Sequence, residues 1–359
     1  MRINVRALQI IIRIIVIISI IVILGLVSFL IVVNVGKNKL YQEADTKAPV
    51  MITTQTSVLE EEIPEEDVEI WQEGDVRYNG QVYRYNKDML TFLALGIDDR
   101  GKVQASNDYT KGGQSDALFL IAINPHNKKV SVIAIPRDTI TEIDVYDKNN
   151  NFLSTVEAQI TLQHGYGDGM ELSCERSVKA VSNLFYQLPI HGYASVGVGA
   201  VPVLNDFVGG IDIELMEQIP NGSPEIKNKK VGDMAHLSGW DAYNYLVYRS
   251  DEFASANQRL ARQKQYVSAF ITAAKEKTQK KLSFPIDLYN KIKSYVVTDV
   301  DVAKMSYLAT ELINYKFDDT QMYSLKGETK MGEKFEEFHP DEKALYELVM
   351  EIFYEPVQK

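Results

Sequence analysis

Carboxylates and arginines gather at the ends of apolar runs in this 359-residue chain. Three motifs carry them: Leu95-Gly96-Ile97-Asp98-Asp99-Arg100, Ser115-Asp116-Ala117 and Ile135-Pro136-Arg137-Asp138. The adjoining apolar runs, which are typical of buried strands, are Leu90–Leu95, Ala117–Ile123 and Val130–Ile135. Ligands of open α/β sheets bind beside strand ends. Carboxylates suit Mg²⁺ and arginines suit phosphate oxygens, so these residue types indicate phosphoryl transfer.

Asp98 and Asp116 are the candidate metal ligands. Asp98 follows a strand and Gly96, where the missing side chain lets the backbone approach a ligand closely. If the two strands are neighbours, the end of the first meets the start of the second, and both carboxylates could share one Mg²⁺ with phosphate oxygens. The alternative is that Asp98, Asp99 and Arg100 form a solvated turn.

Arginines that follow the strands are the candidate anion ligands. Arg137 comes at the end of the third strand, and its planar fork can give a phosphate two parallel hydrogen bonds. Arg249 is a further cation later in the chain. The competing interpretation is an internal ion pair between Arg137 and Asp138.

A long helix predicted at about Ser255–Lys280 places three polar side chains on one face. Arg259, Arg262 and Gln263 are spaced i, i+3 and i+4. Because apolar Val267 continues near this face, the face should point inward. Buried arginines require an anionic partner, which is either an acidic side chain or the phosphates of a ligand.

The elements around these motifs alternate between strands and helices. The turn Pro125–Lys128 predicts a hairpin of Ala117–Asn124 with Lys129–Ile135. Further helices are expected at Leu172–Leu188, Ala200–Val208, Leu237–Tyr248, Val302–Tyr315 and Pro340–Tyr354, and strands at Tyr193–Val198 and Ile211–Leu215. This order predicts an α/β fold with a central mixed β-sheet flanked by helices.

The composition argues against several other functions. A formal net charge of -11 disfavours general nucleic-acid binding, which needs a basic face. The five histidines lack zinc-site spacing, and the chain has neither a glycine-rich phosphate loop ending in Lys-Ser/Thr nor a Gly-x-Ser-x-Gly elbow. His164 either lines the site or is an ordinary loop residue. The single cysteine, Cys174, is expected to pack on an apolar helix face.

The N-terminal residues predict a membrane anchor. Ile14–Gly36 contains no charged residue and follows three arginines, and about 20 apolar residues span a bilayer as a helix. We therefore expect a cytoplasmic N-terminus at 1–13, a single transmembrane signal anchor at 14–36 and an extracellular remainder. Residues 37–87 are predicted to form an acidic stalk that ends in an edge hairpin at Val76–Tyr85. Residues 88–359 are the predicted extracellular catalytic domain.

Taken in order, the motifs resemble those of a known bacterial family. Besides the three motifs above, the matching segments are His164-Gly165-Tyr166, Val208-Gly209-Gly210-Ile211-Asp212, Leu237-Ser238-Gly239, Tyr248-Arg249-Ser250 and Arg259-Leu260-Ala261-Arg262-Gln263. The chain resembles the LytR-CpsA-Psr (LCP) family of cell-envelope proteins, as a divergent member. The resemblance implies an α-β-α domain with an apolar tunnel for a polyprenyl chain. It also implies a membrane-anchored, Mg²⁺-dependent phosphotransferase that attaches a glycopolymer from a polyprenyl-pyrophosphate carrier to peptidoglycan in cell wall biogenesis.

The resemblance further implies roles for individual residues. By match to the family's motifs, Asp98 and Asp116 are Mg²⁺ ligands, and Asp98 or Asp138 activates the acceptor hydroxyl beside Arg137. The expected pyrophosphate contacts are Arg100, Arg137, Arg249, Arg259, Arg262 and Gln263.

The chain departs from the family pattern at three positions. Gln114 and Val247 stand where arginines are common, and Ala256 stands where an aspartate is common. Either Lys111 or Lys264 compensates for the missing cations, or catalysis is lost. In the second case the chain is a non-catalytic module that binds polyprenyl phosphate or cell-wall glycan. A structural envelope-scaffold protein is the third interpretation.

Overall fold

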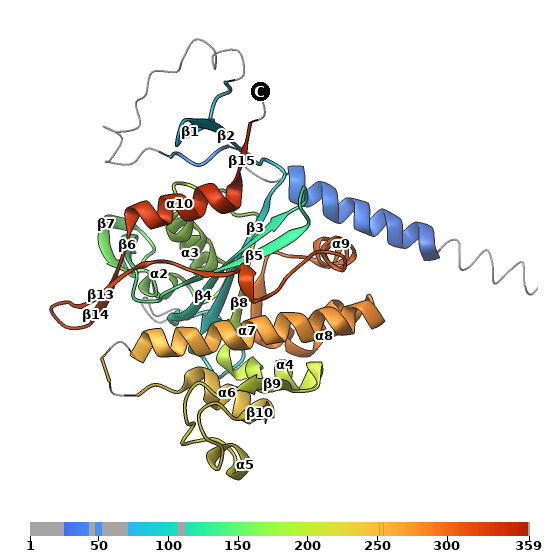
Figure 1. Cartoon of the computed structure of the whole chain (residues 1–359), viewed down its shortest axis with the longest axis vertical. Coiled ribbons are helices and arrows are strands. Elements are labelled where there is room, and N and C mark those ends of the chain that lie inside the picture. The colour runs from blue at the N-terminus through green and yellow to red at the C-terminus, as the bar shows by residue number, and fades with distance from the viewer. Residues whose placement is uncertain are drawn as a thin grey trace, which may run out of the picture.

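The centre of the fold is a mixed sheet of six strands (Figure 1). The computed structural model describes residues 25–42, 47–51, 71–106, 112–250, 252–253 and 255–357. The sheet order is β11-β8-β3-β4-β5-β12. These strands are β3 (Leu90–Ile97), β4 (Ser115–Asn124), β5 (Lys129–Ile135), β8 (Gly192–Gly197), β11 (Val296–Thr298) and β12 (Met322–Ser324). Strands β3 and β8, and β5 and β12, run parallel, whereas the other neighbours are antiparallel.

Helices cover both faces of this sheet, which gives three layers (Figure 1). Side chains alternate along β4, so that Leu118 and Leu120 face one side while Phe119 faces the other. The first face packs on α3 (Glu171–Leu184) and α10 (Glu342–Phe353). The second face packs on α7 (Ser255–Lys280). The predicted α-β-α arrangement around a mixed sheet is therefore confirmed.

Smaller elements surround the three layers. Three short sheets are formed by the pairs β6–β7, β9–β10 and β13–β14, and β2 pairs with both β1 and β15. Their strands are β1 (Val76–Tyr78), β2 (Gln81–Tyr85), β6 (Ile140–Tyr146), β7 (Phe152–Gln159), β9 (Ile211–Glu214), β10 (Met234–Leu237), β13 (Gly327–Met331), β14 (Glu336–Pro340) and β15 (Tyr354–Pro356). The remaining helices are α2 (Leu162–Gly165), α4 (Val201–Val208), α5 (Pro224–Lys227), α6 (Gly239–Val247), α8 (Phe284–Ile292) and α9 (Val302–Leu312).

Most predicted elements are present, and four helices have an end that is shifted by two or more residues. Helix α9 ends at Leu312 instead of Tyr315. Helix α3 ends at Leu184, four residues early, because Tyr186 and Gln187 adopt left-handed backbone angles. Helix α6 starts at Gly239, because Leu237 pairs with Ile211 in a strand. The last helix starts at Glu342, because Pro340 ends β14. The buried Cys174 packs in the core as expected, and burial raises the pKa of its thiol to about 12.

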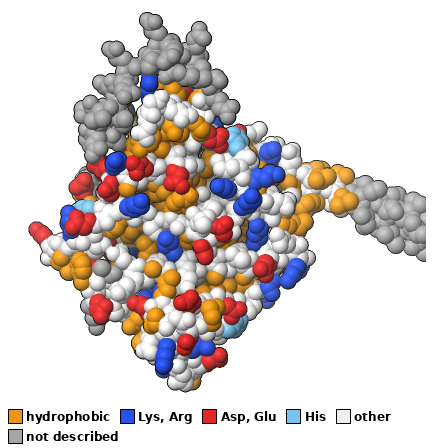
Figure 2. Space-filling model, viewed as in Figure 1, with side chains coloured by type: hydrophobic (Ala, Val, Ile, Leu, Met, Phe, Trp, Pro, Cys, Tyr) orange, Lys and Arg blue, Asp and Glu red, His pale blue; other side chains and the backbone are white. Residues whose placement is uncertain are grey.

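The N-terminal predictions lie partly outside the described residues. Residues 1–24 and 52–70, which include most of the predicted anchor and the acidic run, fall there. Residues 25–42 form a helix that projects from the domain, with apolar side chains exposed along it (Figure 2). Among them Leu30 is 63% exposed, whereas Leu40 is buried against α9. No helix in the described part of the chain is both long and apolar enough to cross a membrane.

Candidate functional site

The ends of β3 and β4 bring the first two motifs together. Gly96 pairs with Ala117 across a β-bulge, and a side chain at Gly96 would crowd Ala117, with 3.1 Å between the two Cβ atoms. Beyond the strand, the Asp98 amide donates to the Gln114 carbonyl at 3.3 Å. The Gln114 amide returns a hydrogen bond to Asp98 Oδ1 at 3.0 Å. The predicted meeting of these strand ends is thus confirmed, and it leaves the carboxylate of Asp98 exposed to solvent.

Asp116 lies between two guanidinium groups. Arg137 Nη1 donates to Asp116 Oδ1, and Arg259 Nη1 donates to Asp116 Oδ2 at 2.9 Å. Arg137 reaches Asp116 because β4 and β5 are antiparallel and place these residues across from each other. Arg259 reaches it from the second turn of α7. Three elements that are far apart in sequence therefore meet at one carboxylate.

Asp138 extends this cluster toward β14. Its Oδ1 accepts from Arg137 Nε at 3.2 Å and from Gln159 Nε2 at 3.1 Å. Gln159 Nε2 also donates to the Glu336 carbonyl at 2.7 Å. The Glu336 side chain lies 3.7 Å from Arg249 Nη2. The sequence analysis missed Gln159 and Glu336, because both belong to hairpins whose side chains are largely polar and show no apolar pattern.

The three arginines share one electrostatic environment. The pKa of Arg259 is lowered, mainly by burial. The neighbouring positive charges of Arg137 and Arg249 lower the pKa of Arg259 further, whereas the negative charge of Asp116 raises it. Burial would also lower the pKa of Arg137, but Asp116 and Asp138 outweigh it, so the pKa of Arg137 is raised. Burial is thus the main cost to the charged form of Arg259, and a bound anion would stabilise that form.

Arg262 does not belong to this cluster. Its Nε donates to the Tyr245 carbonyl at 2.9 Å, and its Nη2 donates to the Tyr248 carbonyl. Its Nη1 is paired with Glu217 in the loop after β9. The side chain is 1% exposed. The predicted pyrophosphate contact at Arg262 stays a prediction, and in this structure an acidic side chain and two backbone carbonyls satisfy the guanidinium.

Arg100 and Gln263 also differ from the predicted arrangement. The Arg100 guanidinium lies over the Tyr243 ring on α6, 5.3 Å from its centroid. Its side chain therefore contacts α6. Gln263 is buried on α7 next to Arg262. The geometry gives neither residue a place among the three clustered arginines.

His164 supports the backbone beneath Asp98. It is buried in α2, and its Nδ1 lies 3.2 Å from the Gly113 carbonyl. Burial lowers the pKa of the His164 imidazole, so the ring is neutral at pH 7. Gly113 precedes Gln114, which holds the Asp98 carboxylate. Of the two interpretations of His164, the structure favours a packing role close to the site.

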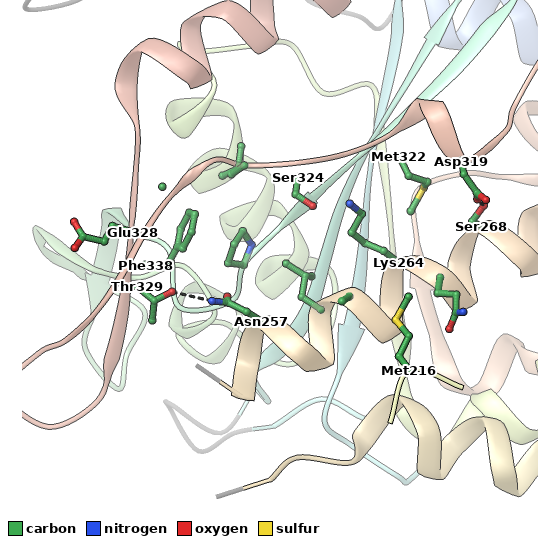
Figure 3. A pocket seen from close by; sticks show the side chains of 16 residues that line it. Met216, Asn257, Lys264, Ser268, Asp319, Met322, Ser324, Glu328, Thr329 and Phe338 are labelled. Atoms are coloured by element: carbon green, nitrogen blue, oxygen red, sulfur yellow. Dashed lines mark hydrogen bonds between the residues drawn. The ribbon is translucent and has the colours of Figure 1, made fainter. Parts of the chain in front are cut away.

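A groove of about 810 Å³ adjoins the arginine cluster. It lies between α7 on one side and β12, β13 and β14 on the other (Figure 3). Pro136 and Leu260, which neighbour Arg137 and Arg259 in sequence, both line it. Asn257 Nδ2 on α7 donates to Thr329 Oγ1 on β13 at 3.0 Å and so bridges the two sides.

Comparison with known proteins places this arrangement in a family. The sequence model of the LytR_cpsA_psr family matches residues 50–352. The chain belongs to this family. TagU of Bacillus cereus, a polyisoprenyl-teichoic acid–peptidoglycan teichoic acid transferase, is 30% identical over 185 residues, which are 51% of this chain and 51% of TagU. Bacillus subtilis TagV, which has the same transferase name, is 29% identical over 198 residues, or 53% of this chain and 45% of TagV. The matched part thus spans about half the length of these relatives.

Solved structures of the family share the fold. The crystal structure of B. subtilis TagV superposes with a TM-score of 0.57 at 22% identity, over 74% of this chain and 97% of TagV. A structure of TagT bound to LI-WTA superposes with a TM-score of 0.55 at 21% identity, over 74% of this chain and 90% of TagT. These comparisons establish the LCP fold for the chain.

Proposed function

We propose that this chain attaches a glycopolymer from a polyprenyl-pyrophosphate carrier to peptidoglycan, as a Mg²⁺-dependent phosphotransferase. The observation that carries the proposal is the convergence of Arg137 and Arg259 on Asp116, with Arg249 beside them. Guanidinium forks gathered beside the ends of β4 and β5 suit the non-bridging oxygens of a pyrophosphate. Relatives named teichoic acid transferases support the same chemistry.

The charge of the cluster supports a metal requirement. The cations Arg137, Arg249 and Arg259 face the anions Asp116, Asp138 and Glu336, so three positive charges meet three negative ones. A pyrophosphate entering a neutral cluster needs further positive charge. Asp98 and Asp116 would hold Mg²⁺, which commonly takes one or two carboxylates together with phosphate oxygens. The metal would polarise the phosphoryl group.

The reaction gives different roles to Asp98 and Asp138. The acceptor hydroxyl of a muramic acid attacks the glycan-linked phosphorus, a phosphodiester forms, and the bond to the polyprenyl phosphate breaks. The hydroxyl proton passes to a carboxylate. Asp98 is exposed, whereas Asp138 is 6% exposed and accepts from Arg137 and Gln159. We therefore assign proton acceptance to Asp98 and the orientation of Arg137 to Asp138. The arginines stabilise the charge that develops on the leaving phosphate.

The lipid part of the substrate would lie against the second face of the sheet. Phe119, Val132 and Ala134 form an apolar cluster there, and α7 covers it with Leu260, Val267 and Ile271. The α7 side chains are only half-buried, which leaves apolar surface for a polyprenyl chain. Leu260 directly follows Arg259, so a tail and a pyrophosphate would sit next to each other.

We also propose that the chain is a single-pass membrane protein with its C-terminal domain outside the cell. The uncharged stretch at 14–36 and the preceding arginines support this topology. Exposed apolar side chains on the helix of residues 25–42, such as Leu26 and Ile31, fit a lipid environment. Protease added to intact protoplasts should remove the domain from residue 37 onward, and protection of the domain would exclude this topology.

A second candidate function is a non-catalytic module that binds polyprenyl phosphate or cell-wall glycan. Gln114 and Val247 favour it, because they replace cations that are common in the family. The deciding experiment incubates the full chain in detergent with a polyprenyl-pyrophosphate glycan, soluble peptidoglycan fragments and Mg²⁺. Mass spectrometry should detect a phosphodiester-linked product that is absent with the Arg259→Ala variant. Tight binding of the lipid without product would instead support the binding module.

A further inference from the structure

We propose that the groove between α7 and β12–β14 binds the sugar chain of the substrate, and that Lys264 holds a phosphate or carboxylate carried by that chain. This inference rests on the proposed function and names the part of the substrate that lies beyond the pyrophosphate. The ligand class is an anionic glycan. Its source is either the glycopolymer donor or the peptidoglycan acceptor, and the experiment below separates the two.

The lining of the groove suits a sugar chain better than a lipid. Amide and hydroxyl groups contribute to it from both sides, through Asn257 and Gln265 on α7 and through Ser324 and Thr329 opposite. Apolar Met216, Met322 and Phe338 lie between these groups, and such mixed surfaces pair with the polar edges and apolar faces of sugar rings. The apolar cluster beneath α7 borders this groove, and the two share Leu260 and Met322.

Lys264 is the cation that this groove presents. Figure 3 shows it reaching from α7 toward Ser324 on β12. It is the one lysine or arginine among the described residues that line the groove. Within the described part of the chain no carboxylate lies within ion-pair distance of it, and burial lowers the pKa of its ammonium group. An anion in the groove would offset that desolvation.

Two carboxylates also line the groove, but neither is paired with Lys264. Asp319 accepts a hydrogen bond from the Ser268 hydroxyl. Glu328 is exposed on β13. Lys264 therefore has no carboxylate partner among these lining side chains.

The position of Lys264 sets the distance between two anionic groups. Lys264 lies five residues beyond Arg259, which is about 7.5 Å along the α7 axis. A glycan whose pyrophosphate contacts Arg259 would thus reach Lys264 with its next units.

The test measures binding of four probes to the full chain in detergent. The probes are a lipid-free glycopolymer with phosphodiester repeats, a neutral oligosaccharide of equal length, a soluble peptidoglycan fragment, and a polyprenyl pyrophosphate without sugar. The variants are Lys264→Gln and Arg259→Ala. Lys291→Gln, which removes an exposed charge on α8, is the matched control.

Lys264→Gln should weaken binding of one of the two anionic glycans by about tenfold or more, because losing a charge-assisted hydrogen bond has an effect of this size. Weakening of the glycopolymer alone identifies the donor, and weakening of the peptidoglycan fragment alone identifies the acceptor. Binding of the neutral oligosaccharide and of polyprenyl pyrophosphate should stay within twofold, as should all binding to Lys291→Gln.

The inference is overturned if Lys264→Gln binds both anionic glycans as the unchanged chain does. The inference is also overturned if Lys264→Gln binds polyprenyl pyrophosphate as much more weakly as it binds the glycans, because Lys264 would then belong to the pyrophosphate site. Arg259→Ala tests the proposed function separately: if it leaves polyprenyl pyrophosphate binding intact, the pyrophosphate site fails whatever Lys264 does.

Discussion

Two arginines on α7 differ in what they do, although they are three residues apart. Arg259 is held by Asp116 at the end of the sheet, beside Arg137 and Arg249. Arg262 is enclosed by Glu217 and two backbone carbonyls of the α6 region. Both side chains are almost completely buried. The partner, and not burial or helical spacing, thus separates an arginine that can bind a ligand from one that joins two parts of the fold.

The largest effect should come from Arg259→Ala. Removing a group that stabilises developing charge costs about 10²–10³ in rate, or about 2.7–4 kcal/mol. Folding should be little changed, because Arg137 still pairs with Asp116. Transferase assays with matched thermal unfolding measure both quantities. Arg259→Lys should rescue poorly, since a lysine lacks the planar fork.

The opposite result is expected for Arg262→Ala, namely a loss of stability with substrate binding retained. It leaves the Glu217 carboxylate and two carbonyls without their donor, and should lower the free energy of unfolding by about 3 kcal/mol. Substrate binding per folded molecule should persist. Denaturant unfolding reports the first quantity and lipid titration the second. A normal stability with lost binding would place Arg262 back in the substrate site.

The substitution Asp98→Asn tests the proposed Mg²⁺ ligand. Replacing a hard anionic oxygen should raise the Mg²⁺ concentration needed for half-maximal activity by about tenfold, a loss of about 1.4 kcal/mol. Because the amide cannot accept the hydroxyl proton, the maximal rate at saturating Mg²⁺ should also fall by about 10²-fold. Because Asp98 is exposed and lies beyond the strand, the melting temperature should be unchanged. A Mg²⁺ titration of initial rates measures the shift. Full activity at the original Mg²⁺ concentration would return Asp98 to the solvated-turn interpretation.

The smallest expected effect is a gain. Gln114→Arg restores a cation beside Asp98 and should tighten binding of polyprenyl pyrophosphate a few-fold, because the position is half-buried and partly screened. Val247→Arg should act in the same direction. Calorimetric titration at low and moderate ionic strength would resolve the change. Weaker binding would mean that the site is already complete without these arginines.

The sequence predicted the parts of the fold that have strong apolar patterns. The β4–β5 hairpin and the helix Ser255–Lys280 lie where they were expected, and the pairing of β3 with β4 places Asp98 next to Gln114. The β6–β7 hairpin was missed, because most side chains of β7 are exposed and show no apolar alternation. That hairpin supplies Gln159.

Long-range pairing limited prediction of the site. Asp116, Arg137 and Arg259 could be grouped by type, but β14 contributes Glu336 from far along the chain, and no motif pointed to it. Arg262 shared a predicted face with Arg259, and its acidic partner, Glu217, lies in an irregular loop. The sequence spacing shows which residues share one face of a helix, whereas only the folded structure shows which residues that face contacts.

Binding of polyprenyl pyrophosphate and of polyprenol without phosphate, compared across Arg137→Ala, Arg249→Ala and Arg259→Ala, tests the central claim most directly. If the three arginines form one pyrophosphate site, each variant should bind the pyrophosphate at least tenfold more weakly, since each removes a charge-assisted contact. Polyprenol should bind all three as it binds the unchanged chain. Equal affinity for the two lipids, or pyrophosphate binding that none of the substitutions alters, would contradict the account.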